Sequence, residues 1–452
     1  MYFLSFSPPA RVCPLLRTLF HTLFHTLFRT LFSRAQARAI ALALLATGPA
    51  VASEAADAGS SQDALGAAFS HYLEQLQGAE QALRAHPFYG SDVERAGAYS
   101  HLFRSVRKSI EQDILQDRDF PYFRSLDLFS REGGDNPDQK YLFAPIDGTG
   151  AYRVWGQRGD ATRVEIQVYA GKPWAGNGRS AGFISHDDIA FADDGSFSLR
   201  VSSRPADKPD LLLPEDASEL FVRFIYGDWQ AQRPGAAHID RIGYEGRPLP
   251  QPASKQLAAD IRQAGDELYT AAVTWPRFVE QRYVNARPAN TLSPLLDTST
   301  LGGVPGRWMS SGHFQLAPGQ AVVLRIPQTT AVYQAVQLTD PWFASLEYGN
   351  RTSSFNREQS LQAPDGAYYY VLSAQDPGYQ NWLDPVGLGR GAMLLRFDGV
   401  NGDIPKAQWP SAQVVAMEDL ASAIPGFATG QLKDREAQLA ARRRHLQQRF
   451  GR

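Results

Sequence analysis

The sequence predicts a mainly β protein of the α+β class, built from two related antiparallel β-sandwich or jelly-roll-like modules. Between residues 141 and 244, and again between 312 and 397, short β-branched and aromatic runs are cut by Gly, Pro and Asp-Gly turns, as in sheet proteins. Helical hydrophobic spacing is confined to the segments before, between and after these two stretches. The two strand-rich stretches also resemble each other.

Three short sequences recur in the same order in the two stretches. Ala151-Tyr152-Arg153-Val154 matches Ala321-Val322-Val323-Leu324 at an offset of 170 residues, Asp194-Gly195-Ser196-Phe197 matches Asp365-Gly366-Ala367-Tyr368 at 171, and Phe221-Val222-Arg223-Phe224 matches Leu394-Leu395-Arg396-Phe397 at 173. Three similar offsets indicate two related modules. A cleft between such modules is a usual place for a ligand.

The first 52 residues have the features of a secretory signal peptide. Five arginines and no acidic residue precede a short apolar core, Ala39 to Ala46, and Ala50-Val51-Ala52 forms a small-x-small cleavage site. We expect cleavage after Ala52, which places the mature chain in the periplasm or outside the cell. The apolar core is shorter than the roughly 20 residues that a membrane-spanning helix needs, so no transmembrane span is expected.

The composition argues against several classes of function. Cys13, the only cysteine, lies in the predicted signal peptide, so no disulfide, thiol nucleophile or cysteine metal ligand is expected in the mature chain. Without the five signal-peptide arginines, 40 of the 45 basic residues remain against 47 acidic ones, a net charge of about −7, which argues against nucleic acid as a partner. Glycine and histidine spacings indicate neither a cofactor nor a metal site.

These patterns divide the chain into six segments. They are the signal peptide or presequence (1–52), a helical N-terminal segment (53–120), a first β-sandwich module (121–250), a helical connector (251–300), a second β-sandwich module (301–410) and a C-terminal helical segment (411–452).

Three features define the helical segments. Residues 60 to 117 predict two helices, with a capping box at Ser91-Asp92-Val93-Glu94 before the second. A proline-rich linker precedes a helix from Ser254 to about Tyr283. The last helix, about Lys433 to Arg449, has an apolar seam and a basic back. Basic residues there favour the helix dipole, and docking on anionic lipid or an acidic partner is the alternative.

Polar side chains gather in two loops of the second module. Asp376 and Asp384 flank Asn381-Trp382, and we predict these two carboxylates as catalytic. Two carboxylates and a Trp platform are the groups that glycan chemistry uses. The predicted substrate-binding residues are Asn350, Arg351, Asn356, Asn381, Trp382, Arg396 and Tyr152. In the alternative interpretation these residues form turns, caps and core, and Arg351 pairs with Asp376 or Asp384.

A nucleophile-elbow pattern occurs at Gly178-Arg179-Ser180-Ala181-Gly182. The elbow needs a strand before the serine and a helix after it. Here the pattern lies in a glycine-rich loop between strand-like runs, so Ser180 is not expected to be a nucleophile.

A further set of residues resembles a large bacterial family. Asp135-Asn136-Pro137-Asp138, Tyr141, Ala144-Pro145-Ile146-Asp147-Gly148 and Tyr152-Arg153-Val154, with Asn350-Arg351 and Asn381-Trp382-Leu383, look like the family that carries domain of unknown function 1214. The resemblance covers residues 120 to 450 and implies an exported, mainly β, jelly-roll-like protein, without implying a reaction. Residues 53 to 120 are too short for domain of unknown function 1254, which precedes it in many relatives.

Two functions remain open. One is a hydrolase or lyase acting on a glycan or a polar-headed apolar small molecule in the inter-module cleft. The other is a non-catalytic periplasmic ligand-binding or protein-interaction module. A catalytic site is expected to show a carboxyl of raised pKa in a concave pocket beside a second acid, whereas a binding module is expected to show an apolar, Trp-rich patch with paired acids. The oligomeric state is not predicted.

Overall fold

A computed structural model describes residues 50–171, 178–301, 303–432 and 434–451. The described residues fall into two units, with the boundary between Ala64 and Leu65. The predicted signal peptide lies outside the described residues except for residues 50–52, which begin helix α3 (Ala50–Ala85). In the described part of the chain no helix is both long and apolar enough to cross a bilayer.

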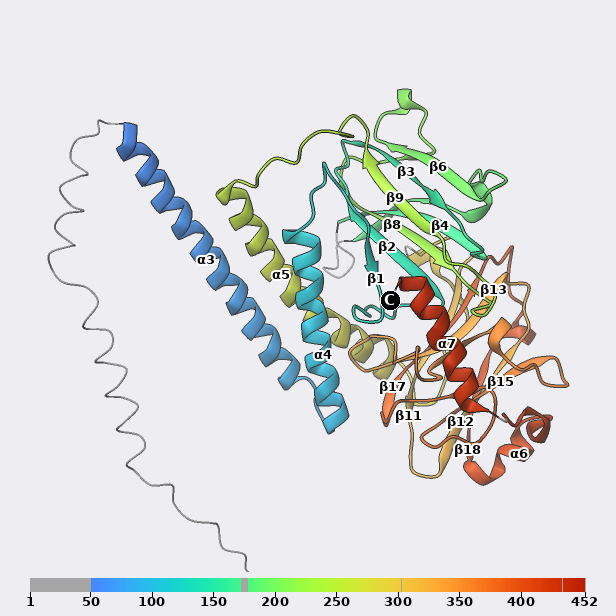
Figure 1. Cartoon of the computed structure of the whole chain (residues 1–452). Coiled ribbons are helices and arrows are strands. Elements are labelled where there is room, and N and C mark those ends of the chain that lie inside the picture. Colours follow the sequence, from blue (N-terminus) through green and yellow to red (C-terminus); the bar gives the residue numbers. More distant parts are fainter. Residues whose placement is uncertain (1–49, 172–177, 302, 433, 452) are drawn as a thin grey trace, which may run out of the picture. The chain divides into compact units, whose positions relative to one another are not determined.

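The strands of the second unit form four sheets, and the same arrangement occurs twice. The first module has a five-stranded sheet in the order β1-β2-β8-β4-β5 and a four-stranded sheet in the order β7-β6-β3-β9. The second module has the orders β10-β11-β17-β13-β14 and β16-β15-β12-β18, so each strand has its counterpart nine strands later. In Figure 1 the first module is coloured from cyan to yellow-green and the second mainly orange. The predicted fold of two related modules is confirmed.

The first-module strands are β1 (Arg124–Leu126), β2 (Gln139–Pro145), β3 (Ala151–Gln157), β4 (Arg163–Ala170), β5 (Arg179–Ile184), β6 (Ser196–Ser202), β7 (Leu211–Leu212), β8 (Ala217–Ile225) and β9 (Ala236–Arg241). The second-module strands are β10 (Leu296–Asp297), β11 (Trp308–Gln315), β12 (Gln320–Pro327), β13 (Tyr333–Thr339), β14 (Ser354–Asn356), β15 (Ala367–Ser373), β16 (Trp382–Leu383), β17 (Arg390–Asp398) and β18 (Ser411–Ala416). The three repeated sequences fall on β3 and β12, at the start of β6 and β15, and on β8 and β17.

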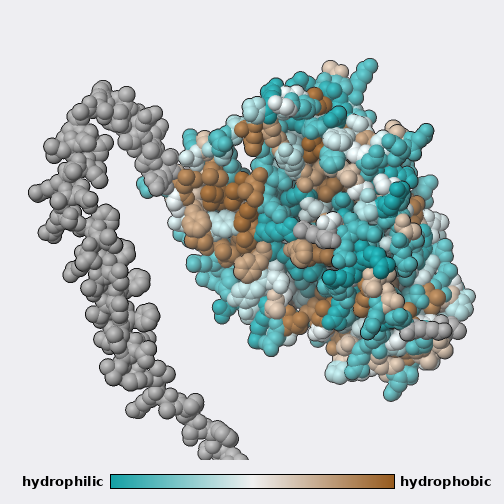
Figure 2. Space-filling view, viewed as in Figure 1, coloured by the Kyte–Doolittle hydropathy of each residue, from teal (hydrophilic) through white to brown (hydrophobic). Residues whose placement is uncertain are grey.

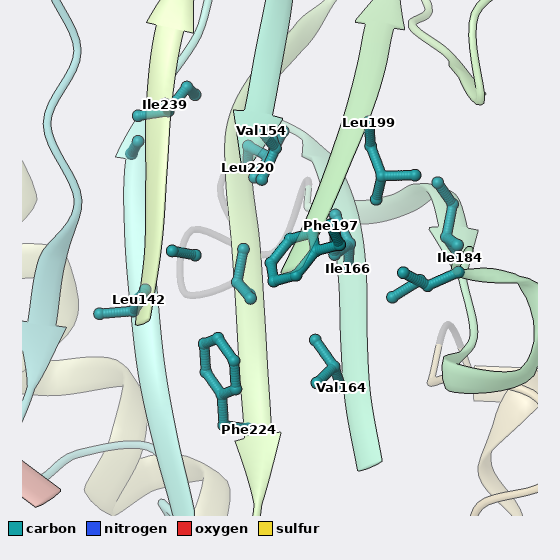
Figure 3. Close-up of a cluster of buried hydrophobic side chains, with 14 of the residues drawn as sticks. Leu142, Val154, Val164, Ile166, Ile184, Phe197, Leu199, Leu220, Phe224 and Ile239 are labelled. Carbon is teal, nitrogen blue, oxygen red and sulfur yellow. The ribbon is translucent and has the colours of Figure 1, made fainter. Parts of the chain in front are cut away.

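Each module buries the apolar side chains that lie between its two sheets. Figure 3 shows this core in the first module, where Ile166 of β4, Leu220 of β8 and Phe197 of β6 are among the buried side chains. Successive side chains of a strand point to opposite faces. The residues of β8 that alternate with this core, such as Phe221 and Arg223, therefore lie on the outer face of the five-stranded sheet, away from the sandwich interior.

Helices precede each module, and the duplication includes them. The helices after α3 are α4 (Asp92–Ser109), α5 (Ser254–Val279), α6 (Leu420–Ala423) and α7 (Arg435–Phe450). Both α4 and α5 continue directly into a π-helical turn, η1 (Ile110–Ile114) and η5 (Glu280–Val284), whose starts are 170 residues apart, as are Ala151 and Ala321 of the first repeated sequence. The predicted capping box is present, because the Ser91 amide donates to the Glu94 carboxylate over 2.8 Å.

The three long helices share a core of their own. Tyr72 of α3, Leu102 of α4 and Leu268 of α5 are buried in it. Phe69 of α3 and Phe103 of α4 are instead 57% and 63% exposed. Figure 2 shows apolar surface gathered over this helical part of the molecule.

Helix α7 turns part of its basic side toward the protein interior. Arg442 and Arg449 are almost fully buried. Both guanidinium groups lie over the Trp229 ring, at 4.6 and 4.7 Å, and both donate to backbone carbonyl oxygens. Burial and the neighbouring Arg449 lower the pKa of His445 to about 2, so this imidazole is neutral. Aromatic faces and carbonyl groups accommodate these two arginines in the interior, while Arg443 and Arg444 of the same helix are exposed.

A buried carboxylate joins the two modules. Asp138, just before β2, accepts hydrogen bonds from the Trp229 indole at 2.9 Å, the Asn356 amide at 2.7 Å and the Tyr333 hydroxyl at 2.6 Å. Tyr333 and Asn356 belong to β13 and β14 of the second module. Burial raises the pKa of Asp138, and the Tyr333 hydrogen bond opposes that rise.

We expect Tyr333→Phe to lower the free energy of unfolding by about 1–3 kcal/mol, because it leaves one oxygen of a buried carboxylate without its donor. Denaturant unfolding at neutral pH measures the loss. Tyr122→Phe removes a hydroxyl from a side chain that is 79% exposed and is expected to change stability by less than about 0.5 kcal/mol. Equal effects of the two substitutions would contradict the role given to Asp138.

Candidate functional site

A cavity of about 310 Å³ lies between the outer faces of the two five-stranded sheets. Strands β1, β2, β4 and β8 of the first module form its floor. Met309 of β11 and Arg396 of β17 line it from the second module, and Lys108 of α4 and Trp275 of α5 close it from the helices. The volume is at the lower end of the usual range for small-molecule sites.

Strand β8 places an acid, a ring and a cation in a row along the floor. Glu219, Phe221 and Arg223 alternate with core residues and all line the cavity. Because a strand rises about 3.3 Å per residue, their Cα atoms lie about 6.6 Å apart. A small molecule lying along this strand would therefore contact an acidic, an aromatic and a cationic side chain in turn.

The middle of the floor is aromatic. The rings of Phe143 and Phe221 stack with centroids 4.2 Å apart, and Tyr141 and Tyr169 lie 5.3 and 6.1 Å from Phe221. The Arg223 guanidinium lies 3.8 Å above the centre of the Phe221 ring. The Arg124 guanidinium lies 4.6 Å from the centre of the Phe143 ring, so the two stacked rings are flanked by arginines and present their edges to a ligand.

A two-glycine turn shapes the wall beside Trp275. Gly133 and Gly134 have φ of +63° and +66°, a conformation that glycine adopts without strain. A Cβ on Gly134 would lie 2.6 Å from the Phe343 ring, so no other residue fits. The Gly134 carbonyl accepts a hydrogen bond from Arg396. The turn thus fixes the position of one of the cavity's arginines.

Three residues that line the cavity hold buried polar atoms without a hydrogen-bond partner among the described residues. The unpartnered atoms are the nitrogen and the oxygen of the Gln139 side-chain amide, Nη1 of Arg223 and the indole nitrogen of Trp275. Gln139 is 2% exposed and Arg223 5%. Buried polar groups in folded proteins are nearly always paired, and each exception needs an explanation. Three of these four atoms are donors.

Most cations of the cavity are neutralised by the protein itself. Lys108 lies 2.7 Å from Glu132, and Arg307 contacts Asp398 at 2.6 Å and Glu165 at 3.1 Å. Arg223 differs from them, since its one polar contact is a 3.2 Å hydrogen bond to the Tyr169 hydroxyl and no carboxylate of the described chain lies within 4 Å. An arginine stays protonated when buried, so Arg223 keeps its charge without a direct carboxylate contact, because Glu165, its register partner on β4, is bound to Arg307 instead.

Glu219 lies between two cavities. It lines the cavity between the sheets and also a second one of about 450 Å³, where acids such as Asp119, Asp147 and Asp260 gather. Burial raises the pKa of Glu219, and Arg124, whose guanidinium is 4.0 Å away, opposes that rise. A buried carboxyl whose pKa is raised is a candidate for proton transfer.

The two predicted catalytic carboxylates have separate partners, and neither lines the cavity. Arg435 binds both oxygens of Asp376 at 3.0 Å and lies 5.3 Å above the Trp382 ring. Asp384 pairs with Arg351 at 3.0 Å, one of the two pairings considered for that arginine. These contacts join loops to each other and to α7. The catalytic assignment of Asp376 and Asp384 stays a prediction.

The predicted amides also bind other parts of the protein. Asn381 is fully buried, exchanges hydrogen bonds with the Leu361 backbone and donates to the Tyr369 carbonyl. Asn356 donates to Asp138, and the Asn350 side chain accepts from Arg443.

The remaining predicted residues divide between fold and cavity. Trp382 is partly buried and donates to the Ser373 carbonyl, and the buried Tyr152 hydroxyl donates to the Arg118 carbonyl. Among the predicted site residues, Arg396 lines the cavity. Ser180 lies within strand β5 and accepts from Gln167 at 2.9 Å, so no nucleophile elbow forms there.

Sequence reasoning missed most of the cavity. Gln139, Glu219, Phe221, Arg223 and Trp275 come from three elements distant along the chain. One signal was available: Arg223 interrupts the apolar run of β8 at the position where Arg396 interrupts β17. A charged residue repeated within two otherwise apolar strands indicates a buried polar site.

Fold and cavity together define a duplicated β-sandwich protein with a ligand-sized cavity between its modules. The crystal structure of an uncharacterised protein from Burkholderia cenocepacia has this fold, with a TM-score of 0.72 and 24% identity over 79% of this chain and 99% of that chain. A protein structure from Vibrio parahaemolyticus matches with a TM-score of 0.41 and 13% identity, over 75% of this chain and 100% of that chain, too low to support an inference. No protein-family model and no curated protein matches the chain, and the resemblance to the family with domain of unknown function 1214 stays a prediction.

Two buried glutamines give a direct test of the cavity. Gln139→Leu removes an amide without partners and is expected to leave the stability of the unliganded protein unchanged or to raise it by about 1 kcal/mol. Gln337→Leu is the matched control: this 2% exposed amide donates to the Asp135 carbonyl at 2.7 Å and accepts from Arg396, so its loss is expected to cost about 1–3 kcal/mol. Chemical denaturation compares the two. A similar cost for both would show that Gln139 is satisfied in the free protein.

Proposed function

We propose that this protein binds a small anionic molecule with a flat apolar body in the cavity between its two modules. We place this binding in the periplasm or outside the cell, in keeping with the predicted signal peptide. We also propose that the chain is a member of the family with domain of unknown function 1214. Of the functions predicted from the sequence, ligand binding has the strongest support, because the cavity offers recognition groups that the fold itself leaves unpaired.

The observation that carries the proposal is the buried guanidinium of Arg223. It has an unpartnered nitrogen, lies on an aromatic ring and has no carboxylate partner in the described chain. Burying an unpaired charge costs several kcal/mol, a cost that a functional site bears when a ligand supplies the missing partner. A carboxylate would accept from Arg223 in a bidentate fashion, while its apolar body lies against Phe143 and Phe221.

Arg223→Gln is expected to weaken binding of an aromatic carboxylate by roughly 10- to 100-fold, because a hydrogen bond to a charged group contributes about 1.5–3 kcal/mol. Isothermal titration with benzoate and its neutral isostere benzamide measures the effect. In the wild type benzoate is expected to bind more tightly, and in Arg223→Gln this advantage is expected to disappear.

Arg95→Gln is the control for net charge, because Arg95 is an exposed residue of α4 paired with Asp92. It is expected to leave benzoate binding unchanged. If benzoate fails to bind the wild type, or binds equally to Arg223→Gln, an anion site at Arg223 is refuted.

A second candidate function is acid–base catalysis on the bound ligand, and Glu219 favours it. Its carboxyl has a raised pKa and lies in the same row as Phe221 and Arg223, with the acidic cavity on its other side. In such a reaction Glu219 as carboxylate takes a proton from a carbon of the ligand and returns it, and the acidic cavity provides exchange with water. The sequence analysis expected a catalytic site to have a carboxyl of raised pKa in a concave pocket, and Glu219 fits that description.

Phenylpyruvate tests this second function, because it combines an aromatic ring, a carboxylate and exchangeable C3 hydrogens. We expect the protein to accelerate exchange of these hydrogens for deuterium in D₂O, followed by NMR. The rate should rise with pH through the raised pKa of Glu219, since the base is the ionised form. Glu219→Gln is expected to abolish the acceleration, while Glu215→Gln, at an exposed position nearby, retains it. Equal rates with and without protein would leave binding as the sole function.

A further inference from the structure

Arg223 and Arg396 occupy the same position in the two halves of the duplicated fold. Arg223 is the third residue of Phe221-Val222-Arg223-Phe224 in β8, and Arg396 is the third residue of the matching sequence in β17. Both strands are the middle strand of their five-stranded sheet, β8 between β2 and β4 and β17 between β11 and β13. The duplication therefore supplies two equivalent arginines.

Both arginines lie on the outer face of their sheet. Their neighbours Val222 and Phe224, and Leu395 and Phe397, are core residues of the two sandwiches. Alternation along a strand directs the arginines to the opposite side, toward the other module. The two outer faces meet at the cavity, and both arginines line it.

Neither arginine is neutralised by the described part of the protein. Arg223 donates to the Tyr169 hydroxyl, and Arg396 donates to the Gln337 side-chain oxygen and the Gly134 carbonyl, all uncharged acceptors. The other cations that line the cavity have carboxylates within 4 Å: Lys108 has Glu132, Arg124 has Glu219 and Arg307 has Asp398. Two arginines of the cavity therefore lack a direct carboxylate partner among the described residues.

We propose that the ligand is a dicarboxylate that places one carboxylate on Arg223 and the other on Arg396. This inference rests on the proposed function of the cavity and narrows its ligand to a class. One carboxylate neutralises one guanidinium, so a monoanion leaves a second unpaired cation in the cavity, whereas a dianion neutralises both. The aromatic residues Phe143 and Phe221 receive the carbon skeleton between the two charged ends.

Isothermal titration of the mature protein with benzoate and with phthalate, isophthalate and terephthalate tests the inference. These acids share one ring and differ in the number and spacing of carboxylates, so the spacing that fits is found within the series. We expect at least one dicarboxylate to bind about ten-fold or more tightly than benzoate. The measured quantity is the ratio of the benzoate and dicarboxylate dissociation constants.

Two substitutions assign that ratio to the second arginine. In Arg396→Gln the ratio is expected to fall to near one, and in Arg396→Lys, which keeps the charge without the fork, to an intermediate value. In Arg223→Gln both ligands are expected to bind weakly. Melting temperatures of the unliganded variants show whether each is folded. If Arg396→Gln is unfolded, the ratio is measured in Arg396→Lys instead.

The outcomes separate the two proposals. If benzoate binds as tightly as the best dicarboxylate, or if folded Arg396→Gln or Arg396→Lys keeps the full wild-type ratio, the dicarboxylate inference is overturned while the anion site at Arg223 stands. If no carboxylate binds the wild type, the proposed function falls with it.

Discussion

The packing of the two outer sheet faces against each other is the constraint on which this structure depends. The carboxylate of Asp138 holds one part of that contact with donors from both modules, and Ile225, Tyr333 and Ala335 form a small apolar cluster beside it. Close packing of polar and charged side chains cannot extend over the whole face, because Arg223 and Arg396 bring two like charges into the contact. The cavity lies where both arginines reach this contact.

The sequence was most informative where structure is local. Turn residues, strand composition and helical periodicity predicted both sandwiches, and the capping box at Ser91 marked the start of α4, because these features depend on neighbours a few residues away. The repeated sequences added long-range information, because two related sequences are expected to fold with the same strand order. Outer-face residues such as Gln139 gave no such signal, because the partner that buries them lies in the other module.

The same limit explains why loop chemistry was a poor guide to the cavity. Polar loops rich in Asp, Asn and Arg are typical of ligand sites, and the loop from Asp376 to Asp384 has that composition. In the structure Arg435 and Arg351 bind those two carboxylates, and Asn381 bonds to the backbone of neighbouring segments. Whether a polar residue serves the fold or a ligand depends on which groups remain unpaired, and pairing across distant segments is not encoded in local pattern.

The duplication has a consequence for how such a cavity originates. A single module would expose its outer sheet face to water, and two identical copies would cover those faces by pairing about a twofold axis. The equivalent arginines would then be related by that axis, and the ligand would meet the same wall on both sides. Fusion into one chain removes this restriction: here Phe221 beside one arginine corresponds to Leu394 beside the other. Once the walls can diverge independently, an unsymmetrical molecule can be held in one orientation only, which a symmetric ancestor could not achieve.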